Sequence, residues 1–156
     1  MILLFFGLYS IKTFAQKQFR VLLITETAGW HHESISQGIE ALNELAAAAH
    51  NFEVDRQQNF IKINKQNLKN YEAVIFLNTT EDIFDDKEQE AFENYIRAGN
   101  EYVGIHAASD TEYNWEWYTS LVGRMFHIHP AQQTAKLRII DPNFPGLEHF
   151  PTRFCG

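Results

Sequence analysis

The sequence predicts an α/β fold in which a mostly parallel sheet carries helices on both faces. Three almost continuously apolar runs support this prediction, at residues 21–25, 73–77 and 102–105. Runs of this kind are typical of strands that are buried on both faces, as the central strands of a parallel sheet are. Helical periodicity fills the intervals, and strand–helix–strand units with short loops form right-handed parallel crossovers. We therefore expect one doubly wound, flavodoxin-like domain.

The interval between the first two apolar runs predicts two helices and an outer strand. Residues 34–49 carry apolar side chains at helical spacing, and Ser34 with Gln37 matches a capping box. Residues 52–55 alternate and predict the outer strand, whereas the polar segment 62–71 predicts a short helix. This order gives two successive strand–helix–strand units.

Later segments continue the same alternation of helices and strands. Asp85 with Glu88 matches a capping box, and Gly99 is placed to end that helix in the left-handed conformation. Residues 114–122 predict a short helix, and residues 136–141 alternate as an antiparallel strand at the sheet edge would. The remaining tail is rich in proline and shows no periodicity.

Composition and charge exclude several classes of protein. The formal net charge of the 156 residues is −7 and the Lys and Arg residues are scattered, whereas nucleic-acid binders cluster them. A single cysteine, Cys155, excludes an internal disulfide and disfavours a Cys-based metal cage or Cys–His pair. The expected partner is a small molecule, and the oligomeric state is left open.

The first fifteen residues predict an export signal rather than part of the fold. Residues 1–14 are largely apolar, and Thr13 and Ala15 occupy the −3 and −1 positions of a cleavage before Gln16. This resembles a secretory signal peptide and is too short to span a bilayer. Export would place residues 16–156 in the periplasm or outside the cell, without stable membrane insertion. The alternative is a short buried N-terminal helix.

Polar side chains follow each of the three expected central strands. Ligands of open α/β sheets bind at the carboxyl ends of the strands, so these side chains predict a site there. The alternative is that loop residues are commonly polar, but this explains histidine poorly. The side chains after the three strands are Glu26, Trp30, His31 and His32; then Asn78, Thr79 and Thr80; then His106, Ser109 and Asp110.

Residues 104–108, Gly-Ile-His-Ala-Ala, match the layout of a nucleophile elbow. Small residues two positions before and after the centre let the backbone turn sharply and push the central side chain outward. His106 holds the centre, which excludes a Ser or Cys nucleophile and allows a general base or a metal ligand. Asp110 would orient His106 if the turn continues as helix. The alternative is a core histidine that is satisfied by a backbone carbonyl.

A metal site and a stacking wall are further hypotheses for this edge. In an extended segment His127 and His129 point the same way and, with His106, could bind Zn²⁺; alternatively they are loop residues that line a cleft or face water. Trp30, Trp115 and Trp117 could stack on a sugar ring or could pack as lids over helix ends. No glycine-rich phosphate loop follows the first strand, so neither nucleotide nor flavin is expected.

Several of these segments resemble the ThuA-like, trehalose-utilisation family. They are residues 24–32 (ITETAGWHH), 77–80 (LNTT) and 104–110 (GIHAASD), and the likeness extends from about residue 20 to residue 152. The resemblance implies the class I glutamine-amidotransferase-like variant of the flavodoxin-like fold, with His in place of the Cys of the amidotransferases. It also implies action on a glucoside or keto-glucoside, such as a trehalose-like disaccharide.

The resemblance leaves two other functions open. Family members continue beyond a segment like residues 146–153, so the resemblance implies a C-terminally incomplete chain. A non-catalytic carbohydrate-binding or accessory domain, or an inactive fragment, is therefore the alternative to a sugar-processing enzyme. The residues expected to bind the sugar are Glu26, Trp30, His31, His32, Thr79, Thr80, Ser109, Trp115 and Trp117, around a catalytic His106 and Asp110.

Overall fold

The computed structural model describes residues 18–57, 62–147, 150 and 153–155. The predicted export signal, residues 1–15, lies outside the described residues. The chain divides into two units, of which the first ends at Phe126 and the second begins at His127. No helix within the described ranges is both long and apolar enough to cross a membrane.

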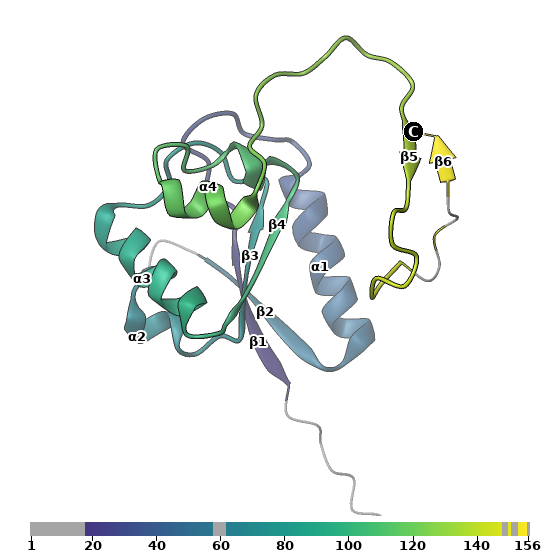
Figure 1. Cartoon of the computed structure of the whole chain (residues 1–156). Helices are drawn as coiled ribbons and strands as arrows, with labels where there is room; N and C mark the ends of the chain where they lie inside the picture. Colours follow the sequence, from purple (N-terminus) through teal and green to yellow (C-terminus); the bar gives the residue numbers. More distant parts are fainter. Residues whose placement is uncertain (1–17, 58–61, 148–149, 151–152, 156) are drawn as a thin grey trace, which may run out of the picture. The chain divides into compact units, whose positions relative to one another are not determined.

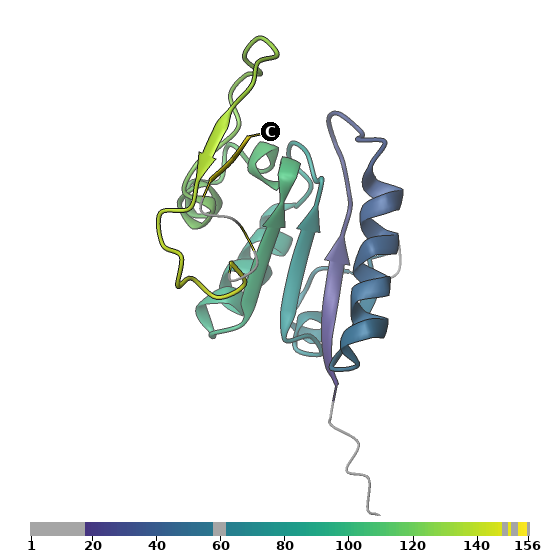
Figure 2. The ribbon, with the colours of Figure 1, turned by 90° about the vertical axis from the view of Figure 1, so that its right-hand side faces the viewer.

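A four-stranded parallel sheet forms the centre of the first unit, with strand order β2-β1-β3-β4 (Figure 1). Helix α1 covers one face, and the other helices of this unit cover the opposite face (Figure 2). The predicted flavodoxin-like α/β fold is thereby confirmed. The elements are β1 (Phe19–Ile24), α1 (Ile35–Ala49), β2 (Phe52–Arg56), α2 (Lys65–Leu68), β3 (Ala73–Leu77), α3 (Asp86–Arg97), β4 (Glu101–Ile105), the 3₁₀ helix η1 (His106–Asp110) and α4 (Glu116–Val122).

Two apolar clusters hold the helices on the sheet. Successive strand residues point to opposite faces, so neighbours in β1 belong to different clusters. The larger cluster joins Leu22 and Phe76 to residues of α2, α3 and α4, and it is rich in aromatic rings. The smaller cluster contains only four buried residues, and α1 contributes partly buried side chains to it. The four buried residues are Val21, Leu23, Ile75 and Leu77.

One predicted helix cap is confirmed and the other is wrong. The Asp85 carboxylate accepts from the backbone N–H groups of Lys87 and Glu88, and the Glu88 side chain completes the capping box. Ser34 makes no such bond, because its backbone is already helical (φ −77°, ψ −1°) and a capping side chain needs extended backbone. Its hydroxyl instead accepts a hydrogen bond from the amide of Asn78.

The predicted burial of the third apolar run on both faces is wrong. Strand β4 pairs with β3 on one side, and no strand of the described residues pairs with its other side. Val103, in the middle of β4, is 46% exposed, so the sheet face on which its side chain lies is not fully covered at this strand. A strand's composition does not report its place in the sheet order, which depends on the other strands.

In the second unit, β5 (Lys136–Arg138) pairs antiparallel with β6 (Arg153–Cys155). The antiparallel pairing was predicted, but its partner was not. The partner is β6 in the tail and not a strand of the parallel sheet. The sequence did not predict β6, because a three-residue strand is too short to show periodicity.

Candidate functional site

His106 lies at a sharp turn directly after β4. Its φ is +54°, a left-handed conformation that residues with a Cβ rarely adopt, and its side chain is exposed. A Cβ added at Gly104 would lie 2.6 Å from the Tyr102 hydroxyl and 3.1 Å from the Ala108 Cβ. The small residue before His106 is thus a steric requirement, as the elbow hypothesis expects, and the Ala108 Cβ is one of the atoms that a larger residue there would meet.

The ring of His32 lies against the ring of His106. Their centroids are 4.8 Å apart and the ring planes meet at 87°, an edge-to-face contact. The two residues follow β1 and β4, which are separated by β3 in the sheet. The loops at the carboxyl edge therefore bring together two imidazoles that are 74 residues apart in sequence (106 − 32).

The residues that follow β3 hold the His32 loop. The Asn78 amide donates to the Ser34 hydroxyl oxygen at 3.0 Å, and the Thr80 hydroxyl donates to the Trp30 carbonyl at 3.0 Å. These two bonds bracket the His31–His32 dipeptide. The His31 ring itself lies 3.3 Å from the Thr27 hydroxyl, measured from Nδ1 to Oγ1.

The same residues also hold the His106 loop. The backbone N–H of Asn78 donates to the carbonyl of Ile105 at 3.2 Å, and the Thr79 and Thr111 hydroxyls are 2.8 Å apart. Thr79 and Thr80, which were expected to bind sugar, are fully buried and use their hydroxyls inside the protein. Their place in the site is to hold its loops.

Four residues with left-handed backbone gather in the segments after β3 and β4. Each has a φ of +54° to +56° and none is glycine, although such residues are uncommon and cost free energy. Isolated parallel bridges, Thr27 to Thr80 and Glu81 to Thr111, tie these segments to each other and to the loop after β1. The left-handed residues are Asn78, Glu81, His106 and Glu112.

Glu112 is a buried carboxylate that joins the β4 loop to the start of α3. It accepts from the N–H groups of Ile83 and Phe84, both at 2.8 Å, and from the Gln89 amide at 2.7 Å. Burial raises the pKa of Glu112, although these hydrogen bonds oppose the rise. No local sequence signal indicates this structural role of Glu112, because its hydrogen-bond partners lie more than twenty residues away.

Asp110 does not orient His106 in this structure. The turn after His106 is a 3₁₀ helix, in which residue i+3 rather than i+4 lies over residue i. The Ser109 hydroxyl accordingly donates to the His106 carbonyl at 3.3 Å, while the Asp110 carboxylate accepts from the Tyr113 hydroxyl. Burial and the contact with Asp110 raise the pKa of Tyr113 to about 12.

The three tryptophans have different environments. Trp115 and Trp117 are partly buried and pack on Phe92 of α3, which favours their alternative role as packing residues. Trp30 is 73% exposed and lies next to the two histidines of its loop. Trp30 therefore has the open ring face that stacking on a sugar requires.

The remaining predicted site residues are the carboxylate Glu26 and the histidines His127 and His129. Partial burial and the negative charge of Glu88 raise the pKa of Glu26, which follows β1. His127 and His129 are exposed and belong to the second unit, so the zinc set that combines them with His106 stays a prediction. Among the residues that the structure describes, no group of three or more His, Cys, Asp or Glu side chains is placed to hold a metal ion.

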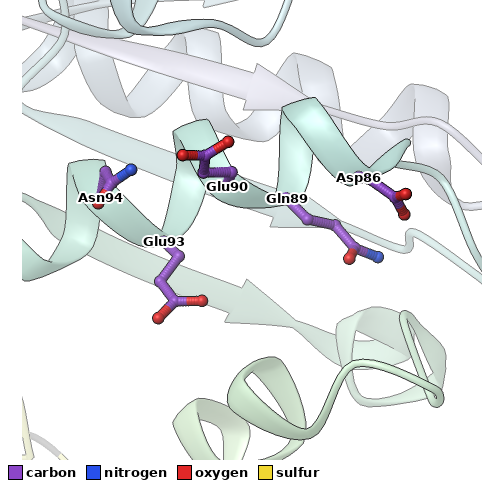
Figure 3. A pocket seen from close by; sticks show the side chains of 5 residues that line it. All are labelled: Asp86, Gln89, Glu90, Glu93 and Asn94. Atoms are coloured by element: carbon purple, nitrogen blue, oxygen red, sulfur yellow. The ribbon is translucent and has the colours of Figure 1, made fainter.

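A polar hollow of about 400 Å³ lies along α3 (Figure 3). Its lining contains three carboxylates and two amides from one helix and none of the histidines. The residues are Asp86, Gln89, Glu90, Glu93 and Asn94.

Comparison with known proteins agrees with this architecture. A ThuA-like protein from Bacteroides uniformis has a similar solved structure, with a TM-score of 0.72 and 23% sequence identity. The alignment covers 94% of this chain and 61% of that protein, and a likeness at this identity supports the fold alone. No curated protein matches the chain. The family model ThuA, described as trehalose utilisation, matches residues 20–155, so the chain belongs to this family, which is associated with carbohydrate metabolism.

Proposed function

We propose that the chain is a sugar-processing enzyme that acts on a glucoside or keto-glucoside, such as a trehalose-like disaccharide, through acid–base chemistry at His106. The observation that carries the proposal is the exposed imidazole of His106, held on a left-handed elbow against His32. Backbone strain of this kind costs roughly 1–3 kcal/mol and clusters at functional sites. Imidazole exchanges protons near neutral pH, which suits a general base.

The side chains around His106 would orient its ring and bind the sugar. The His32 ring limits the orientations that His106 can adopt, a role that was first expected of Asp110. Trp30 would stack on a sugar ring, and the Glu26 carboxylate would accept hydrogen bonds from sugar hydroxyls. Metal analysis of the purified protein tests the zinc hypothesis.

The test is turnover of keto-glucosides and of trehalose-like disaccharides by the purified chain and its variants. We expect His106→Ala to lower kcat by at least about 100-fold, because general acid–base catalysis contributes about 10²–10⁴. His50→Ala is the matched control, because His50 is an exposed histidine at the end of α1. Unchanged turnover in His106→Ala would exclude acid–base chemistry at this residue.

A second candidate is carbohydrate binding without catalysis, which the exposed ring of Trp30 favours. Calorimetry separates the two functions. Sugar binding that survives His106→Ala and is lost in Trp30→Ala, with no turnover by the unmodified chain, would support a binding domain.

A further inference from the structure

We infer that Asn78 is a positioning residue that brings His32 and His106 into contact. It is 3% exposed and follows β3, the strand between those that lead to the two histidines. Its backbone N–H donates to the residue before His106, and its side-chain amide donates to the hydroxyl two residues after His32. One buried residue therefore contacts both histidine loops. The catalytic consequences rest on the proposed function, but the contact itself does not.

Asparagine meets two requirements at this position. The backbone is left-handed (φ +54°), which asparagine tolerates better than most residues with a Cβ. The amide supplies a donor for Ser34, 44 residues away in sequence. Glycine would satisfy the backbone requirement without the donor, so Asn78→Gly removes the side-chain bond without adding strain.

The two histidine loops do not depend equally on this amide. The His106 loop is also held by the hydroxyl of buried Tyr118, which donates to the Ala108 carbonyl at 2.8 Å, and by the Thr79–Thr111 pair. On the His32 side, the Thr80–Trp30 bond holds the segment before the histidines, and the Asn78–Ser34 bond ties the end that leads into α1 to the segment after β3. Loss of the Asn78 amide should therefore free the α1 end of the His32 loop, so that the His32 ring moves away from His106, which stays in place.

The experiment is two-dimensional ¹H–¹⁵N NMR of the histidine rings in the full chain, with no substrate required. His32→Gln and His106→Gln assign the two rings, and each should shift the resonances of the other, since aromatic rings in contact alter each other's shielding. We expect Asn78→Gly to abolish this mutual shift. Ser34→Ala removes the same hydrogen bond from its other end, so it should cause the same loss, with no further loss in the double variant.

Asn100→Gly is the matched control. Asn100 is partly buried and its amide donates to the Tyr95 carbonyl at 2.8 Å, before β4 and thus at the amino edge of the sheet. Thermal unfolding of every variant verifies that it is folded. The inference is overturned if folded Asn78→Gly keeps the mutual shift, or if Asn100→Gly loses it to the same extent.

Turnover gives a second readout if a substrate is found. Without the His32 ring against it, His106 can adopt other orientations. Misorientation of a catalytic group can cost about 100-fold in rate, so Asn78→Gly should lower kcat more than it raises KM. Turnover without this fall in kcat would refute the catalytic consequence. Absence of turnover in the unmodified chain would count against the proposed function, whereas the NMR comparison would still decide whether Asn78 positions the rings.

Discussion

The two faces of the parallel sheet are packed very differently. Under α2, α3 and α4, twelve buried residues form a cluster in which the rings of Phe76, Phe92 and Tyr118 contact one another or shared neighbours. Among the described residues, the cluster under α1 has four buried members, all of them from strands, and α1 itself buries Ile35. One face is a close-packed aromatic core, and the other is lightly covered by a single helix.

This difference extends to the candidate site. The His106 loop continues into α4, whose Tyr118 is fully buried on the aromatic face and bonds back to Ala108. The His32 loop continues into α1, on the lightly covered face. The candidate site thus joins a firmly held half to a lightly held half, and the bonds from Asn78 and Thr80 to the second half carry correspondingly more of its positioning.

The largest expected effect comes from neighbouring leucines in β1. Leu22 and Leu23 are both fully buried but face opposite clusters. Large-to-small core changes of this type cost about 2–5 kcal/mol, and the cost is highest where the surroundings cannot collapse. We expect Leu22→Ala to lose about 4 kcal/mol and Leu23→Ala about 2 kcal/mol, measured as the free energy of unfolding in urea. Equal losses would show that the two faces are equally rigid.

A smaller effect is expected where α1 approaches the sheet. A Cβ at Gly38 would lie 2.8 Å from a methyl carbon of Leu77, so α1 or Leu77 must move in Gly38→Ala. Overpacking costs about 1–3 kcal/mol, and this outweighs the gain of about 1 kcal/mol in helix propensity. Because α1 is lightly held, we expect a net loss of no more than about 1 kcal/mol in urea unfolding.

The control for this comparison is Gly38→Ala in a Leu77→Ala background. The contact is absent there, so the same change should become neutral or stabilising. A stabilising Gly38→Ala in the unmodified chain would contradict a close approach of α1 to β3.

The smallest expected effect is a pH dependence from Glu112. Because burial raises its pKa in the folded state, the folded protein holds this proton to higher pH than the unfolded chain does. The associated stability is fully present below the unfolded pKa, about 4.3, and is lost as the pH rises through the folded pKa. Glu112→Gln should remove this loss in unfolding curves measured from pH 4 upward.

Glu116→Gln is the matched control, because Glu116 is exposed at the start of α4. Its pH profile should follow that of the unmodified chain. If Glu112→Gln also follows it, the buried carboxylate does not couple stability to pH.

Local sequence signals predicted much of the fold. The α3 capping box could be recognised because Asp85 and Glu88 are three residues apart, and both partners of the cap lie within one turn. The same pattern at Ser34 and Gln37 was misleading, because the Ser34 backbone is helical and its hydroxyl bonds across the fold to Asn78. A local pattern predicts correctly only where no distant partner competes for the same group.

The sequence by itself determined where the strands of the parallel sheet lie along the chain and which polar residues follow them. Apolar continuity and helical spacing are properties of neighbouring residues, so they can be read along the chain. Only the tertiary structure decided that His32, rather than Asp110, contacts His106, and that β4 lies at the edge of the described sheet. The physical reason is that strand order and loop contacts depend on residues far apart in sequence, whose proximity arises only when the sheet assembles.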